Sequence, residues 1–314
     1  MNLRPKTVRR LLYVAVVFAA VIAVGFGVRA YQDRQRHKRI LADRAAGLAA
    51  FQRGDYPSAL ALLRGSVRTD SGDFPGLLAL ATARARVELP GGRHIPEAIR
   101  LFEVLRSARP GSGGAPADAA TAPAVVNPLL DLYTRAGYST EALKLSDAVL
   151  AVRPNDPAAL RARSIALFSL ARFDEALTAS LQLNDAAPFD LNGHLQTFWL
   201  LRRAKTPPEE IVRRFESWVA KYPNDPRFEM LLGQACGEAG DRRRALELLR
   251  TAAERPAPDA EFVAQLVRVF DQQRLFEDSR AVLARAAERS DDPAILRLLV
   301  LRLWQDGDHA AVIT

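Results

Sequence analysis

The sequence has few of the residues from which catalytic and metal sites are built. Its one cysteine, Cys236, excludes a disulfide framework and a site made of several thiolates. The four histidines are scattered, with no pair at metal-binding spacing on a helix: His37, His94, His194 and His309. The glycines of residues 111–114 lack the Lys-Ser/Thr of a phosphate loop, and there is no serine elbow. The sequence therefore predicts a protein that is not an enzyme, with no catalytic, cofactor-binding or metal-binding residue.

Most of the chain, residues 45–314, has no net charge. The 314 residues carry 44 Lys and Arg against 36 Asp and Glu, a net charge of +8. Ten of the basic residues and only two of the acidic ones lie in residues 1–44, so the rest is neutral overall. A neutral body lacks the basic face of a nucleic-acid-binding domain. Apolar residues make up 49 % of the chain, which excludes a disordered protein.

One long apolar run lies near the N-terminus. From Leu11 to Val28 there are 18 residues without a charge, which as a helix span about 27 Å, close to the thickness of a bilayer core. The run predicts a transmembrane helix over 11–28, between a basic N-tail (1–10) and a basic juxtamembrane segment (29–39). The residues expected to anchor it in the lipid bilayer are Leu11, Phe18, Ile22 and Val28.

Small residues recur at every fourth position of this run. Such a stripe lets two helices approach closely, so it predicts a homo-oligomer formed through the transmembrane helix. The stripe consists of Ala15, Ala19, Ala23 and Gly27.

Basic residues flank both ends of the run, so the positive-inside rule gives no clean orientation. Because a short tail with four positive charges resists crossing, we expect the N-terminus inside and the body outside. This places the body in the periplasm, held by a bacterial inner membrane. A cytoplasmic body stays open, and so does a cleaved, soluble periplasmic binding protein, since residues 28–30 loosely fit a cleavage site.

A short motif, made of a turn, an aromatic residue and a small residue, recurs along residues 40–314. The small residue serves as an anchor for counting, and the steps between anchors are 39, 44, 34, 35, 34, 34 and 33 residues. The anchors are Ala59, Ala98, Ala142, Ala176, Ile211, Ala245, Ser279 and Val312. A proline follows four of them after twelve residues, and Gly47, Ser164 and Gly233 precede three of them by twelve.

This pattern resembles the tetratricopeptide repeat (TPR), a helix–turn–helix unit of about 34 residues. The resemblance implies an all-α fold: a TPR-like α-solenoid of helix–turn–helix repeats, preceded here by one transmembrane helix. Repeats 1–2 would occupy 40–110 and repeats 3–8, the last incomplete, 124–314. The Gly-, Ser- and Pro-rich segment 111–123 is expected to be a flexible linker that divides them. The fifth copy is degenerate, with Ile211 as its anchor.

The joints between copies predict where helices stop and start. An Asp that caps the next helix precedes a Pro in its first turn, where no N–H is needed. The capping residues are Asp156, Asp225 and Asp292. Within the repeats we expect Cys236 to be a core residue and His194 a surface or packing residue. We expect core or inter-repeat packing for Trp199, Trp218 and Trp304.

In the TPR family, the first helices of successive repeats line a concave groove that binds a protein or peptide. The resemblance implies groove contacts at about the fifth and ninth positions of these helices. Counted from the anchors, these are Asn127, Asp131, Arg161, Ile165, Met230, Gln234, Ala264 and Arg268. The Lys and Asn residues of the family's carboxylate clamp are not found here, so a receptor for chaperone C-termini is not expected.

These features favour a membrane-anchored TPR scaffold that binds a protein partner in an envelope assembly, secretion or biogenesis complex. The alternatives are the non-catalytic N-terminal repeat region of a larger membrane enzyme, and the cleaved periplasmic binding protein described above.

Overall fold

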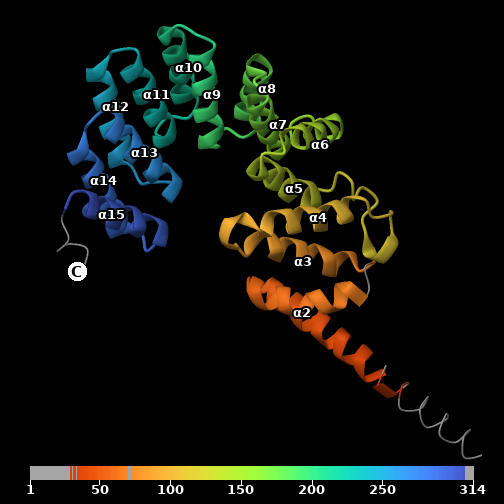
Figure 1. The fold of residues 1–314 in the computed structure, drawn as a ribbon. Coiled ribbons are helices and arrows are strands. Elements are labelled where there is room, and N and C mark those ends of the chain that lie inside the picture. The colour runs from red at the N-terminus through yellow and green to blue at the C-terminus, as the bar shows by residue number, and fades with distance from the viewer. Residues whose placement is uncertain (1–28, 30, 33, 70–71, 308–314) are drawn as a thin grey trace, which may run out of the picture. The chain divides into compact units, whose positions relative to one another are not determined.

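The computed structural model describes residues 29, 31–32, 34–69 and 72–307. They form two compact units, which divide between Tyr138 and Ser139. The described residues form helices and no strand, and most successive helices are joined by short turns, with a longer connection over 107–122 (Figure 1). This confirms the all-α helical-repeat solenoid that the 34-residue period predicts.

The first unit begins with a helix over 34–52. It continues with α2 (Tyr56–Thr69), α3 (Phe74–Arg86), η1 (Pro90–Gly92), α4 (His94–Arg106), η2 (Ser112–Gly114) and α5 (Pro123–Ala136). The second unit consists of α6 (Ser139–Val152), α7 (Pro157–Ser169), α8 (Phe173–Ala186), α9 (Leu191–Arg203), α10 (Pro208–Lys221), α11 (Pro226–Glu238), α12 (Arg242–Glu254), α13 (Ala260–Gln272), α14 (Phe276–Arg289) and α15 (Pro293–Gln305).

The anchors are buried at the helix–helix contacts, as predicted for the described copies. In the fourth copy the Ser164 hydroxyl donates to the backbone oxygen of Ala176, the anchor twelve residues later, at 2.9 Å. In the sixth, a Cβ on Gly233 would lie 3.3 Å from the backbone oxygen of Ala245 and 3.0 Å from Leu249. A small residue on each helix therefore brings the two backbones close. The anchor Val312 lies outside the described residues.

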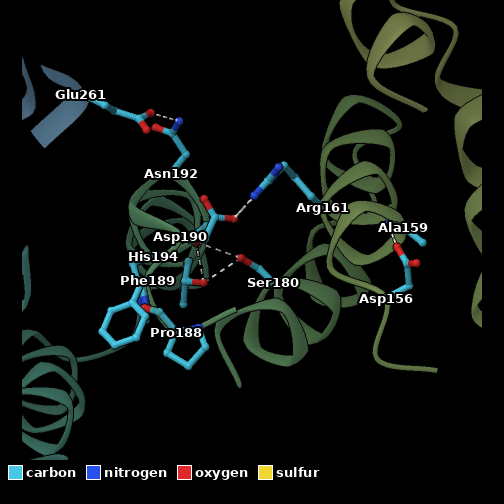
Figure 2. Close-up of polar contacts among 12 residues, drawn as sticks. Asp156, Ala159, Arg161, Ser180, Pro188, Phe189, Asp190, Asn192, His194 and Glu261 are labelled. Atoms are coloured by element: carbon cyan, nitrogen blue, oxygen red, sulfur yellow. Dashed lines mark hydrogen bonds and ion pairs between the residues drawn. The ribbon is translucent and has the colours of Figure 1, made fainter. Parts of the chain in front are cut away.

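The predicted helix starts are confirmed by their hydrogen bonds. A carboxylate oxygen of Asp156 accepts from the N–H of Ala159 at 3.0 Å (Figure 2). Asp225 accepts from the N–H of Arg227 at 3.0 Å. Asp292 accepts in the same way from Ala294 at 2.8 Å. Each carboxylate satisfies a backbone donor that the first helical turn leaves without a partner.

The segment 111–123 does not divide the chain as predicted. It belongs to the first unit, whose boundary lies after α5, and three of its alanines are buried: Ala115, Ala119 and Ala122. Gly113 has φ +57°, and a Cβ there would lie 1.3 Å from the backbone oxygen of Gly72. The glycines thus allow a close approach of two backbone segments, so their abundance reflects packing as well as a turn.

Two of the three tryptophan predictions are wrong. Trp218 is buried, but Trp199 and Trp304 are 56 % and 63 % exposed. Both rings are therefore largely at the surface of α9 and α15. No helix in the described ranges is long and apolar enough to cross a membrane. The predicted transmembrane segment 11–28, with its anchor residues and small-residue stripe, lies outside those ranges.

Candidate functional site

The predicted groove residues fall in both units. Asn127 and Asp131 lie on α5 in the first unit, where Asp131 is exposed and its carboxylate is 3.6 Å from the guanidinium of Arg135. Asn127 is half-buried. The other six predicted residues lie in the second unit, on α7, α11 and α13. The second unit therefore holds most of the predicted groove.

On α11 the prediction is wrong for both residues. Met230 is completely buried and Gln234 is only 7 % exposed. Helix α11 contacts α9 and α13, the first helices of the copies before and after it. Asn192, at the start of α9, donates a hydrogen bond to Glu261, at the start of α13 (Figure 2). Met230 and Gln234 are therefore buried on a helix that has a first helix of another copy on each side.

On α7 the predicted arginine already has a partner within the chain. The Arg161 guanidinium lies 2.7 Å from the Asp190 carboxylate, just before α9, as Figure 2 shows. Arg44 forms an equivalent pair with Asp73 in the first unit, at 2.5 Å, and there hydrogen bonds from Arg44 hold the pKa of Asp73 below its ordinary value. In both cases the arginine tethers one copy to the start of the next. Ile165, one turn from Arg161, is half-buried.

The structure brings Ala264 and Arg268 together at an open hollow between α13 and α15, with a volume of about 500 Å³. We call it the α13/α15 groove. Its opposite wall is formed by residues of α15: Leu298, Leu301, Arg302 and Gln305. Leu301 is 57 % exposed, so the hollow presents apolar surface to solvent.

A buried arginine in this wall of the groove joins α15 to its neighbours. Arg302 is 7 % exposed and lies 2.8 Å from Asp271 of α13 and 3.2 Å from Asp306, which follows α15. Its guanidinium carbon is also 5.3 Å from the centre of the Phe276 ring at the start of α14. Because all three elements meet at one arginine, α15 is fixed against the seventh copy.

Two exposed arginines lie near Leu301, of which Arg268 lines the groove. Arg268 donates to the side-chain oxygen of Gln265 at 3.1 Å, and Arg297 is exposed one turn before Leu301. Among the described residues, no carboxylate forms an ion pair with either arginine. An exposed leucine beside two arginines suits a segment that carries apolar and acidic side chains.

Leu301 and Arg297 are functional candidates that the sequence reasoning did not name. They occupy the ninth and fifth positions of the eighth copy when counted from Val312. The same rule that selected Ala264 and Arg268 finds them once it is extended by one repeat.

Comparison with known proteins identifies the fold. No family model matches the sequence, and no curated protein does either. Among solved structures, a tetratricopeptide repeat protein from Parabacteroides merdae matches with a TM-score of 0.55 and 17 % identity, over 85 % of this chain and 99 % of its own. Yeast Tom70 matches with a TM-score of 0.54 and 16 % identity, over 82 % of this chain and 53 % of its own. The fold is that of the tetratricopeptide repeat.

Such folds are typical of scaffolds for protein–protein interaction.

In this TPR array the degenerate fifth copy is filled by aromatic rings. His194 is buried, donates from Nε2 to the backbone oxygen of Pro188 at 2.7 Å, and lies 4.9 Å from the Trp218 ring. Burial lowers the pKa of His194 and raises that of the buried Cys236 thiol. Both residues are packing residues, as predicted.

Proposed function

We propose that this protein is a membrane-anchored TPR scaffold that holds a protein partner in the α13/α15 groove. The observation that carries the proposal is the exposed Leu301 beside Arg268 in a hollow of the second unit. Apolar area in a hollow with a charged rim is a common form of peptide-binding surface. The partner segment would place an aliphatic side chain against Leu301 and acidic side chains toward the arginines.

The anchor of this scaffold is the apolar run 11–28. We propose that it spans a bacterial inner membrane with the N-terminus inside, and that the repeats serve an envelope assembly, secretion or biogenesis complex in the periplasm. The anchor would hold the groove at the bilayer surface. This raises the effective concentration of a partner in the same membrane.

Site-specific crosslinking tests the groove. A photoreactive amino acid at position 301 of the full chain in its membrane should yield a discrete crosslinked band. The control position is 243, because Arg243 is exposed on α12, outside the groove lining. Leu301→Glu combined with Arg268→Glu should abolish recovery of the band's protein while the helical circular-dichroism spectrum stays unchanged. Equal crosslinking from 301 and 243 would contradict a groove-specific partner.

A topology experiment tests the anchor and its side. A phosphatase that is active only outside the cytoplasm and, separately, a fluorescent protein that matures only inside are fused after Thr314. Phosphatase activity in the membrane fraction is the expected result. Fluorescence alone would reject the periplasmic orientation, and full activity in the soluble fraction would reject the anchor.

A further inference from the structure

A second cavity lies at the other end of the seventh repeat, and it shares no lining residue with the α13/α15 groove. It has a volume of about 510 Å³, within the range of ligand pockets. We call it the α13/α14 cavity. Its floor is apolar: Val263, Leu266, Val282, Ala286 and Ile295. The rigid Pro-Ala-Pro turn at 256–258 forms one lip, and the last turn of α14 forms another.

The fifth repeat shows what fills this place elsewhere in the array. Its anchor Ile211 precedes the anchor Ser279 by 68 residues, so Trp218 corresponds to Ala286 and Tyr222 to Ser290. In the fifth repeat these two rings are stacked, with centres 5.8 Å apart. Phe189, which corresponds to Ala257, lies 5.0 Å from the Tyr222 ring. At these three positions the seventh repeat has alanine or serine in place of an aromatic ring. All three of its residues line the α13/α14 cavity.

A basic residue stays at the rim in both repeats. The ammonium of Lys221 lies 4.9 Å from the centre of the Trp218 ring, a cation–π contact. The corresponding residue of the seventh repeat is Arg289, which lines the cavity. A ring that entered the cavity at the place of Trp218 would therefore meet a guanidinium where Trp218 meets an ammonium.

Arg285, one turn before Arg289 on α14, also lines the cavity. The other charged groups there are engaged: Arg255 pairs with Glu229 at 2.6 Å, and Asp259 and Asp292 cap α13 and α15. No described carboxylate lies within ion-pair distance of Arg285 or Arg289. Two neighbouring guanidinium groups favour an anion at the mouth of an apolar cavity.

We propose that the α13/α14 cavity binds a free aromatic carboxylate. The ring takes the space that Trp218 and Tyr222 fill in the fifth repeat, beside Arg289, and the carboxylate lies toward Arg285. This site is independent of the partner groove proposed above.

The test is calorimetric titration of the full chain in lipid nanodiscs with N-acetyl-L-tryptophan. Saturable binding of one molecule per chain is expected, with about tenfold weaker binding for N-acetyl-L-tryptophanamide, which lacks the charge. Arg285→Gln should weaken binding of the acid by about the same factor and change binding of the amide less, because one charge-assisted contact to the carboxylate is removed.

Two filling variants keep the test decisive. Ala286→Trp restores the fifth repeat's residue and should abolish binding while it raises the melting temperature; Ser290→Tyr is the second filling variant. Arg243→Trp adds a tryptophan on exposed α12 and should bind as the wild type does. Absence of saturable binding to the wild type, or unchanged binding to a folded Ala286→Trp protein, would overturn the proposal. Equal affinity for acid and amide would overturn its anionic part.

Discussion

The fifth and seventh repeats have the same helix–turn–helix backbone but fill it in opposite ways. The fifth lacks a small anchor and packs aromatic rings between its helices and against Phe228 of the next copy. The seventh has the small anchor Ser279, carries alanine and serine where the fifth has tryptophan and tyrosine, and leaves the α13/α14 cavity. The repeat period thus fixes the path of the backbone, while the residues at the joint decide whether the joint is solid or hollow.

The largest expected effect comes from giving the fifth repeat the residue of the seventh. Trp218→Ala should lower the free energy of unfolding by about 3–5 kcal/mol, because it removes a buried ring stacked on Tyr222 and Phe228. Chemical denaturation of the full chain measures the loss. The matched control is Trp199→Ala, which removes an exposed ring and should cost less than about 1 kcal/mol. Equal losses of unfolding free energy from both variants would refute the tight packing of rings in the fifth repeat.

The next largest effect concerns Arg302, which pairs with Asp271 and Asp306 and so joins α15 to the seventh repeat. Arg302→Ala should cost about 2 kcal/mol, because it removes a buried guanidinium that contacts Asp271 and Asp306, while Asp306 keeps its pair with Arg280. Arg161→Ala is the control: its side chain is 48 % exposed, and surface pairs contribute about 0–1 kcal/mol. Denaturant midpoints of the two variants provide the comparison. A loss for Arg302→Ala no larger than for the control would show that packing alone holds α15.

A smaller effect is a contribution of the fifth repeat, and not of the seventh, to the pH dependence of stability. His194 and Phe262 occupy corresponding positions, and burial lowers the pKa of His194 from its ordinary 6.5, against opposing influences of Pro188 and Asp190. A lowered folded-state pKa means that the unfolded chain binds the proton first, so stability should fall as the pH drops below about 6.5. His194→Phe should lack this part of the pH dependence. Melting temperatures between pH 5 and 8 measure it, and identical slopes would exclude the histidine as the source.

The smallest perturbation is chemical labelling of thiols. Cys236, on α11, is 1 % exposed, and burial raises the pKa of its thiol. It should react with a disulfide reagent only when the sixth repeat opens. Leu301→Cys, in the open α13/α15 groove, should react at the rate of an exposed thiol. Rapid labelling of Cys236 in the native protein would mean that the sixth repeat opens readily.

Much of the fold could be predicted from the sequence because its signals are local or periodic. The anchors Ala176 and Ala245 repeat at the period of the structural unit, and Asp156 caps a helix that starts within the next few residues. The candidate site was only partly predictable. Ala264 and Arg268 line the groove, whereas Met230 and Gln234 are buried although they occupy the same repeat positions.

The sequence by itself determined the helical repeat, its period and the ends of its helices, because these depend on residues within one repeat and its neighbour. Only the tertiary structure decided which faces of those helices stay open. That outcome depends on how the copies stack: Asn192 and Glu261, 69 residues apart, meet across the sixth repeat. It also depends on side-chain volume at each joint, where Trp218 fills a space that Ala286 leaves empty.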